Sequence, residues 1–233
     1  AIGDSGTGMH MAIGILAALQ QRHRTELGQL VEVSMQDAVV NLMRISLRDH
    51  QRFGKPMERN GNQLGQTVPG STFKCAPGGP NDYVYLFVQP QMWAPFIAAT
   101  GLAQLGEDAR FSTPADRWEN REALSAIVEQ WTSTRSKYEV MEVLGAAGVP
   151  CGACQDTGEV LGDPHLRARE MIVDVDYPKR GTYQTVGSPI KMSASTTEVV
   201  RPPTLGEHTQ EVLAQFCDVQ DEEYERYRAA GII

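Results

Sequence analysis

The fold is decided near the start of the chain, where a run of small residues continues directly into an apolar segment. The run reads Gly3-Asp4-Ser5-Gly6-Thr7-Gly8, and the apolar segment reads Met9-His10-Met11-Ala12-Ile13-Gly14-Ile15-Leu16-Ala17-Ala18-Leu19. The apolar segment has hydrophobic residues on almost every side, which is typical of a helix that is packed on most faces. The glycine-rich run predicts a tight turn that leads into this helix.

The next two segments predict that this helix belongs to an α/β fold. Gln29 to Ser34 alternates apolar and polar residues, which indicates a short strand. Met35 to Phe53 has helical periodicity and carries Arg44, Arg48 and Arg52 along one side. We interpret that basic side as a solvated or salt-bridged surface, with phosphate binding as the alternative. Helix, strand and helix in this order are typical of α/β domains.

A change of composition after Gly54 divides the chain into domains. The stretch up to Gly70 is rich in Gly, Pro, Asn and Gln, as linkers are. We predict that residues 1–55 are part of a large α/β domain, that 56–177 form a smaller α+β domain, and that 178–233 return to the large domain. The expected later strands are 72–75, 83–88, 149–154, 171–177 and 183–186. The expected later helices are 92–101, 117–131, 137–147, 157–162, 164–169, 207–216 and 221–230, with Ser136 as an N-cap.

Charge and composition exclude several classes of protein. The 233 residues include 21 Lys and Arg against 29 Asp and Glu, and the net charge of −8 argues against a nucleic-acid or anionic-membrane surface. No apolar run is long enough to span a bilayer. Four cysteines make no disulfide scaffold, and five scattered histidines have no metal-site spacing. We expect a cytoplasmic protein with no metal, no membrane and no nucleic-acid partner.

Asp4 has two interpretations. The first is a helix N-cap, because Asp accepts hydrogen bonds from the free N–H groups at a helix start. The second is a nucleophile, because the helix dipole favours an ionised carboxylate at that end. In the second interpretation Gly6 and Gly8 let a bulky substrate approach, and their backbone N–H groups bind an oxyanion. The glycine spacing matches neither the dinucleotide-binding motif nor a phosphate-binding loop.

Three other features carry weaker signals for chemistry. Cys151 and Cys154 form a C-x-x-C, but no second such pair accompanies them, so a redox or zinc role is the minor interpretation. His10 is interpreted as a hydrogen-bonded packing residue rather than as a base. Glu207 and His208 precede a helix and are interpreted as a cap and packing element.

Several motifs in order carry a resemblance to a known family. The chain resembles the family III CoA-transferases, and within them the formyl-CoA:oxalate branch. The motifs are Gly3-Asp4-Ser5-Gly6-Thr7-Gly8-Met9-His10, Ile13-Gly14-Ile15-Leu16-Ala17-Ala18-Leu19, Ser34-Met35-Gln36-Asp37-Ala38-Val39, Leu47-Arg48-Asp49, Gly148-Val149-Pro150-Cys151-Gly152, Asp163-Pro164-His165-Leu166, Thr185-Val186-Gly187-Ser188-Pro189-Ile190-Lys191 and Leu205-Gly206-Glu207-His208-Thr209. They extend over nearly the whole chain.

The resemblance implies a fold and a reaction. The fold is a Rossmann-like large domain, incomplete in this chain, plus a smaller α+β domain. Coenzyme A passes from an acyl-CoA to a small free carboxylic acid through a covalent aspartyl intermediate, and Asp4 falls on that aspartate. Coenzyme A is then a substrate, and no cofactor is needed. Met35 matches a position near bound CoA, with a core methionine as the alternative. The family also implies an interlocked homodimer.

Two departures from the family pattern accompany the resemblance. Oxalate-specific relatives carry consecutive glycines in the region that corresponds to 60–70, and this chain lacks them, so the formyl-CoA and oxalate pair is one option among related small acids. The family also has a nucleotide-binding half that precedes Asp4, so we expect this chain to be the C-terminal part of a longer protein. The alternatives are an acyl-CoA racemase of the same fold and an inactive truncated fragment.

Overall fold

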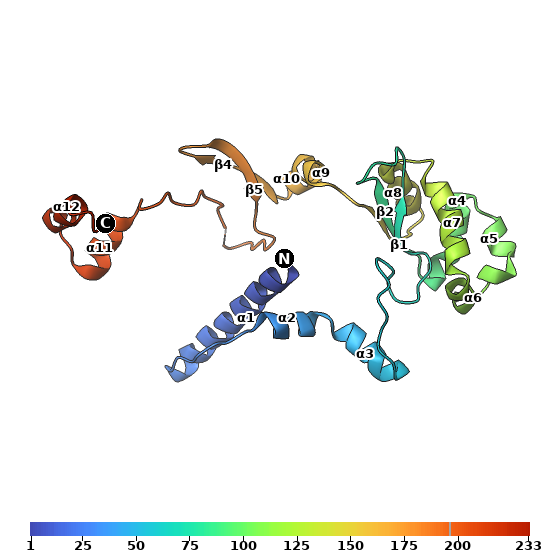
Figure 1. Cartoon of the computed structure of the whole chain (residues 1–233), viewed down its shortest axis with the longest axis horizontal. Helices are drawn as coiled ribbons and strands as arrows, with labels where there is room; N and C mark the ends of the chain where they lie inside the picture. Colours follow the sequence, from blue (N-terminus) through green and yellow to red (C-terminus); the bar gives the residue numbers. More distant parts are fainter. Residues whose placement is uncertain (196) are drawn as a thin grey trace. The chain divides into compact units, whose positions relative to one another are not determined.

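The chain folds as two compact units. The computed structural model describes residues 1–195 and 197–233, apart from the side chain of Asp49. The first unit is Ala1–Gln63 and the second is Leu64–Ile233 (Figure 1). The assignment of residues 178–233 to the same domain as residues 1–55 stays a prediction.

The first unit is built from three helices. Helix α1 spans Ile2–Thr25 and ends at Glu26, whose φ of 60° is left-handed. Helix α2 spans Met35–Leu42, and α3 spans Arg44–Phe53. The hydroxyl of Ser34 accepts a hydrogen bond from the Asp37 amide and so caps α2. The single helix predicted over 35–53 is therefore interrupted at Met43.

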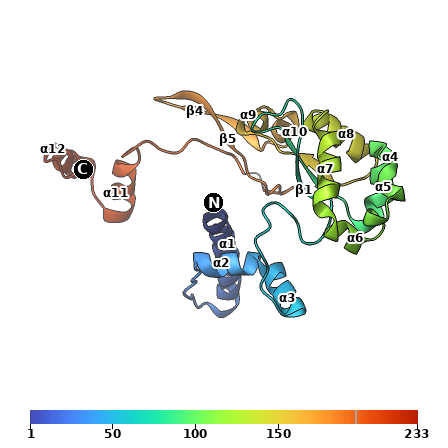
Figure 2. The ribbon, with the colours of Figure 1, turned by 45° about the vertical axis from the view of Figure 1, so that its right-hand side comes forward.

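The glycine-rich run is not a turn, and that prediction is wrong. Residues 3–8 lie inside α1, which packs against α2 (Figures 1 and 2). A Cβ on Gly6 would lie 2.9 Å from Leu42 Cδ1, and one on Gly14 would lie 2.9 Å from Val31 Cγ1. Glycine is thus needed at these positions for close approach of the neighbouring segment, rather than for a left-handed turn.

The strand expected at Gln29–Ser34 is also absent from the described residues. The alternation itself is real, because Val31 and Val33 are half-buried while Leu30 and Glu32 are exposed. A strand needs a hydrogen-bonded neighbour, and none of the described strands pairs with this segment. The segment is therefore a connection without strand pairing, and its Val31 lies beside Gly14 of α1.

The core of the second unit is a small antiparallel sheet with helices packed on it. Its strands are β1 (Gly70–Lys74), β2 (Tyr83–Phe87) and β3 (Cys151–Ala153), in the order β1-β2-β3. Helices α7 (Arg121–Thr132) and α8 (Lys137–Ala146) contact the sheet, and α4 (Trp93–Thr100) contacts α8 (Figure 2). The largest fully buried side chains include Phe96, Phe111, Leu86, Leu105, Leu124 and Leu144.

Short helices complete this part of the chain, and their starts are strongly capped. They are η1 (Pro90–Met92), α5 (Gln104–Glu107), η2 (Ala109–Phe111), α6 (Pro114–Glu119), α9 (Thr157–Gly162) and α10 (Pro164–Ala168). Capping boxes begin α6, α8 and α9, and Ser136 caps α8 as predicted. The helix predicted over 117–131 is divided at Asn120 into α6 and α7.

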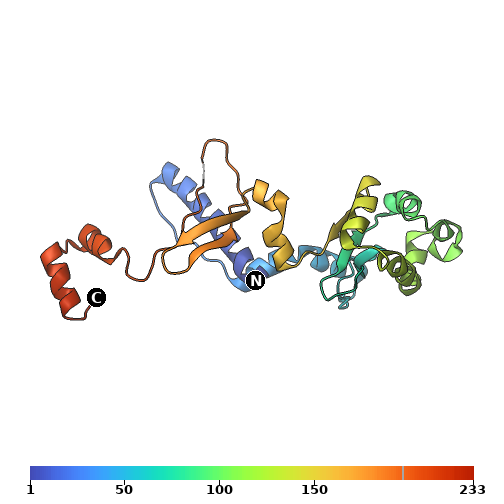
Figure 3. The ribbon, with the colours of Figure 1, turned by 90° about the horizontal axis from the view of Figure 1, so that it is seen from above.

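The remaining elements are a hairpin and two helices. Strands β4 (Ile172–Tyr177) and β5 (Gly181–Val186) pair antiparallel as a two-stranded ribbon, drawn in orange in Figure 3. Helices α11 (Thr209–Cys217) and α12 (Asp221–Ala229) follow. The predicted mixture of helices and sheets is confirmed, although the strand pairs within the described ranges are all antiparallel. None of the described helices is long and apolar enough to cross a bilayer.

A buried lysine ties four segments of the second unit together. Lys137 is 4% exposed. Its Nζ donates hydrogen bonds to the carbonyls of Asn81 at 3.1 Å and Cys154 at 3.0 Å, and to Glu159 Oε2 at 2.6 Å. Burial is the largest single effect on Lys137 and works against its charge, but the hydrogen bond to Glu159 and the negative charges nearby together outweigh it, so the pKa of Lys137 is raised. The same hydrogen bond lowers the pKa of Glu159. The start of β2, the end of β3, α8 and α9 therefore share one charged anchor.

Removing this anchor should destabilise the second unit. Lys137→Met leaves two carbonyls and one carboxylate without their donor, so the free energy of unfolding should fall by about 3 kcal/mol. Urea denaturation of the complete protein measures it. Lys74→Met is the control, because Lys74 is an exposed residue of β1 and should change stability by less than about 0.5 kcal/mol. Equal stability of the two variants would contradict the assignment of Lys137 as an anchor.

Candidate active site

Asp4 lies in the first turn of α1. The N-cap residue is Ala1, and no side chain caps this helix start, so the interpretation of Asp4 as an N-cap is wrong. The carboxylate is exposed, and within the described part of the chain it has no hydrogen-bond or ion-pair partner. Among the described residues, Asp4 therefore forms no polar side-chain contact that would stabilise this unit. Its favourable interaction is with the helix dipole, which favours acidic residues in a first turn.

Because residues 3–8 are helical, the backbone N–H groups from Ser5 onward are already hydrogen-bonded within α1. The amide of Ser5 donates to the Ala1 carbonyl at 2.9 Å, and the amides that follow it lie within the hydrogen-bonded helix. The expectation that Gly6 and Gly8 offer free N–H groups is thus wrong. Any role of these two glycines in substrate binding comes from the space they leave.

That space differs sharply between the two glycines. Gly8 follows Asp4 by one turn and lies on the same side of α1. A Cβ on Gly8 would have no heavy atom within 4 Å, and Gly8 is exposed. Because helical side chains lean toward the N-terminus, a larger residue at position 8 would cover the turn that holds Asp4. Gly6 is buried against α2, so its small size is explained by packing.

Two polar side chains of α1 form hydrogen bonds with backbone carbonyls of the same helix. The Thr7 hydroxyl donates to the carbonyl of Gly3, and His10 Nδ1 lies 2.7 Å from the carbonyl of Gly6. A carbonyl can only accept, so Nδ1 of His10 carries the proton in this contact. His10 is half-buried. The expected hydrogen bond of His10 is confirmed, but His10 is not among the buried core residues.

Met35 begins α2 and is 58% exposed, so it is not a core methionine in this unit. It shares one face of α2 with Val39 and Leu42, which follow it by one and two turns. A Cβ on Gly3 would lie 3.9 Å from Val39, and one on Gly6 would lie 2.9 Å from Leu42. Met35 thus lies between Val31, which faces Gly14, and Val39, which faces Gly3. Its contact with a substrate stays a prediction.

Large apolar side chains surround these residues and are open to solvent. Ile13, Leu16 and Leu30 are 66%, 65% and 81% exposed. Soluble proteins rarely leave so many large apolar side chains of neighbouring segments uncovered unless the surface contacts something. The sequence predicts that this helix is packed on most faces, and within this unit several of those faces are uncovered.

The cysteines do not form a second reactive centre. Cys151 and Cys154 lie along an extended segment, because Cys151 begins β3 and the Cys154 amide still bonds the Tyr83 carbonyl. Three residues of strand separate their Cα atoms by about 10 Å, beyond the roughly 7 Å that a disulfide spans. Cys75 is buried, and burial raises the pKa of its thiol to about 11. The described residues contain no cluster of side chains suited to a metal ion.

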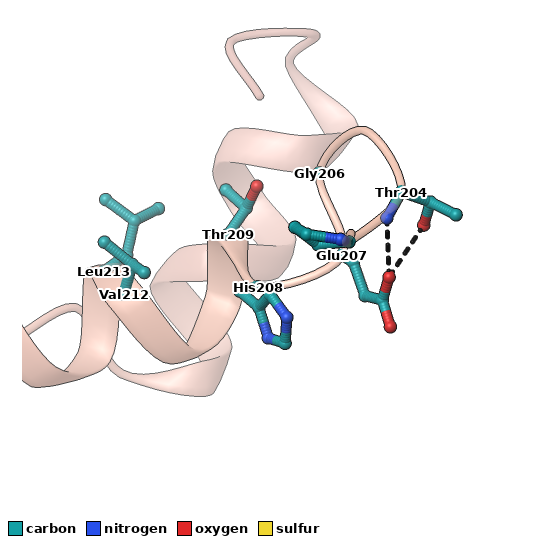
Figure 4. A pocket seen from close by; sticks show the side chains of 8 residues that line it. Thr204, Gly206, Glu207, His208, Thr209, Val212 and Leu213 are labelled. Atoms are coloured by element: carbon teal, nitrogen blue, oxygen red, sulfur yellow. Dashed lines mark hydrogen bonds between the residues drawn. The ribbon is translucent and has the colours of Figure 1, made fainter. Parts of the chain in front are cut away.

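A shallow pocket lies at the start of α11 (Figure 4). Its lining includes Glu207, whose Oε2 accepts from the Thr204 amide at 2.6 Å and from the Thr204 hydroxyl at 3.1 Å. Arg201 also bonds both carboxylate oxygens of Glu207. These contacts, led by Arg201, lower the pKa of Glu207 to about 2. Glu207 thus holds the turn before α11 through its hydrogen bonds. The interpretation of Glu207 and His208 as a cap and packing element is wrong, because no side chain caps α11 and both residues are exposed.

The buried charges of the second unit were missed in the sequence. Neither Lys137 nor Arg117 lies in a motif with a recognisable chemical spacing, yet both are at least nine-tenths buried. Their partners are backbone carbonyls that lie far along the chain or in another short helix. The one available signal for Lys137 is its position directly after the capping serine, followed by an aromatic residue and Glu139.

Known proteins share this chain's sequence and fold. The profile of CoA-transferase family III matches residues 1–209. The formyl-CoA:oxalate CoA-transferase of Streptomyces coelicolor is 46% identical over 245 residues, which cover all of this chain and 60% of that protein. The protein of the same name from Rhodopseudomonas palustris is 42% identical and aligns with 94% of this chain and 56% of its own length. The chain thus spans about 60% of the length of the curated relatives it matches.

Solved structures agree on the fold. A crystal structure of a CAIB/BAIF family protein from Brucella suis matches 90% of this chain and 53% of that one, with a TM-score of 0.74 and 26% identity. The crystal structure of Rv3272 from M. tuberculosis matches 90% of this chain and 54% of that one, with a TM-score of 0.72 and 24% identity.

The same substitution at the two glycines should have opposite effects on stability. Gly8→Ala should raise the free energy of unfolding by up to about 1 kcal/mol, because alanine favours the helix and meets nothing there. Gly6→Ala should be less stable than Gly8→Ala by about 1–2 kcal/mol, because the new methyl group collides with Leu42. Thermal or urea unfolding of the complete protein compares them. If both variants change stability equally, Gly6 is not a contact point for α2.

Proposed function

The chain belongs to CoA-transferase family III, and from this premise we propose that it is part of an enzyme that moves coenzyme A from an acyl-CoA to a free carboxylic acid. Asp4 is the nucleophile. The observation that carries the proposal is the state of this residue: an exposed carboxylate in the first turn of α1, without a structural partner among the described residues and with open space over Gly8.

The reaction consists of acyl exchanges in which each bond broken is replaced by one formed. An Asp4 carboxylate oxygen attacks the thioester carbonyl, and CoA leaves as a thiolate, so that a mixed anhydride links Asp4 to the acyl group. The thiolate then attacks the Asp4 carbonyl and releases the donor acid, which leaves an aspartyl-CoA thioester. The acceptor carboxylate attacks this thioester and expels CoA thiolate again, which leaves a second mixed anhydride between Asp4 and the acceptor. The thiolate then attacks the acceptor's carbonyl, so that a new acyl-CoA forms and Asp4 leaves as a free carboxylate. Covalent catalysis of this kind divides one difficult exchange into easier steps.

The surroundings of Asp4 suit a carboxylate nucleophile. Asp4 is an acidic residue in the first turn of α1, where the helix dipole favours negative charge. Gly8 leaves room for the thioester, and Met35 and Gly6 contribute to the binding region, Met35 as an exposed thioether and Gly6 by letting α2 come close. No metal or cofactor is required, because the proposed steps use a carboxylate and a thiolate alone.

The proposed CoA donor and acceptor are both derived from small carboxylic acids. The formyl-CoA and oxalate pair is supported by the names of the relatives, and the region 60–70 argues for a related pair because it lacks consecutive glycines. The complete protein is proposed to act as an interlocked homodimer in the cytoplasm. That arrangement accounts for the uncovered apolar side chains on α1 and on the segment before α2.

Replacing the nucleophile should abolish turnover. Asp4→Asn in the complete protein should lower the CoA-transfer rate by at least about a thousandfold, because an amide is a far poorer nucleophile than a carboxylate. Incubation with formyl-CoA followed by mass spectrometry should find an aspartyl adduct on the peptide that contains Asp4. Asp37→Asn is the matched control, since Asp37 is an exposed acid in the first turn of α2. Retained turnover, or α-proton exchange of an acyl-CoA without CoA transfer, would contradict the proposal.

Filling the space over Asp4 should slow the reaction without unfolding the protein. Gly8→Leu places a branched side chain over the turn that holds Asp4, so kcat/KM should fall by about a hundredfold, roughly 2.7 kcal/mol of transition-state stabilisation. Steady-state kinetics and a melting curve are measured together. The melting curve shows whether a fall in kcat/KM comes from blocking Asp4 or from loss of the fold, since a Cβ at position 8 meets no heavy atom within 4 Å in this unit. Unchanged kinetics would show that the substrate approaches Asp4 from another side.

A further inference from the structure

Arg117 is a buried cation in the second unit. It lies in α6 and is 5% exposed. Its guanidinium lies over the ring of Trp93, with 4.5 Å from Cζ to the ring centroid, and its Nη1 donates to the Phe111 carbonyl at 2.9 Å. The stack and the hydrogen bond fix both the plane and one edge of the group, so the guanidinium is held rigidly.

The charge of Arg117 has no ionic partner among the described residues. The carboxylate of Asp116, its neighbour, is turned into the cap of α6, where it accepts hydrogen bonds from Ser112 and Thr113. Burial lowers the pKa of Arg117, and Asp116 opposes this only as a distant charge. The exposed Arg110 nearby has a full ion pair with Asp108 at 2.7 Å. Because a buried charge needs a counter-charge more than an exposed one does, the difference calls for an explanation.

The remaining donors of Arg117 are not completely covered. A guanidinium has five N–H groups, and one of them is used by Phe111. Across the described residues, only Trp131 Nε1 is a fully covered side-chain nitrogen or oxygen without a partner. The other nitrogens of Arg117 therefore retain solvent contact although the side chain as a whole is covered. The guanidinium beside the Trp93 ring is thus held rigidly and is not completely covered, although Arg117 as a whole is 5% exposed.

We propose that this guanidinium of Arg117 is a binding site for a small free carboxylate, which lies against Trp93. Two parallel N–H groups match the two oxygens of a carboxylate. A singly charged ligand fits best, because the other cations around it are occupied: Arg110 by Asp108, and Arg121 by the Trp118 carbonyl and ring. The site stands on α4, η2 and α6, so it does not rest on the proposed role of Asp4.

Acetate is the probe for this site. The complete protein, labelled with ¹⁵N, is titrated with sodium acetate at constant ionic strength, and the Arg117 Nε–H and Trp93 indole signals are followed by NMR. Both should move together and saturate in the millimolar range. Arg117→Lys should weaken the affinity at least tenfold, because lysine lacks the planar pair of donors. Arg121→Lys is the matched control and should bind acetate as the unaltered protein does.

Three results would overturn the proposal. One is a linear, unsaturated response of the Arg117 and Trp93 signals in the unaltered protein, which decides the matter even if Arg117→Lys fails to fold. Another is equal acetate affinity in the Arg117→Lys variant. The third is tighter binding of inorganic phosphate than of acetate in a parallel titration, which would assign a different ligand chemistry to this guanidinium.

Discussion

The close approach of α1 to α2 is the contact on which the candidate site depends. Helix α1 begins with three glycines within its first two turns, and each costs about 1 kcal/mol relative to alanine in a helix. Hydrogen bonds from Thr7 and His10 to carbonyls one turn earlier do not compensate, because such bonds slightly weaken helices. Packing on α2 at Gly6 therefore decides that this start is helical, and it fixes the axis that carries Asp4.

The errors made from the sequence have the same origin. Glycine-rich runs favour turns locally, and only the presence of Leu42 and Val31 beside α1 shows that Gly6 and Gly14 serve close packing. Alternation at Gln29–Ser34 reports correctly which side chains are half-buried, but it carries no information on whether a partner strand exists. By contrast, Ser136 and the strands around residues 72 and 85 were predicted, because a cap and a hairpin are specified by residues close in sequence.

The candidate site was predicted in part. Reasoning from the residues left Asp4 open between a cap and a nucleophile, and the resemblance to a family favoured the nucleophile. The position of Asp4 one turn inside α1, with Ala1 as the N-cap, removes the capping explanation. The two buried charges could not be foreseen, since the Lys137 donors reach carbonyls 56 and 17 residues away and the Arg117 stack requires the fold of α4 and α6.

The proposed chemistry places a demand on the surface around Asp4. A mixed anhydride reacts readily with water, so a transferase must keep water from the face of α1 on which the anhydride forms. That face continues from Asp4 and Gly8 through Met11 to Ile15, which is 45% exposed. Covering these apolar side chains would exclude water and would also strengthen the interaction of the helix start with the carboxylate, because charges interact more strongly in a dry environment. The open apolar surface and the unpartnered carboxylate therefore indicate the same requirement. In the proposed reaction, the segment that carries Asp4 must be enclosed so that CoA transfer is faster than hydrolysis of the anhydride.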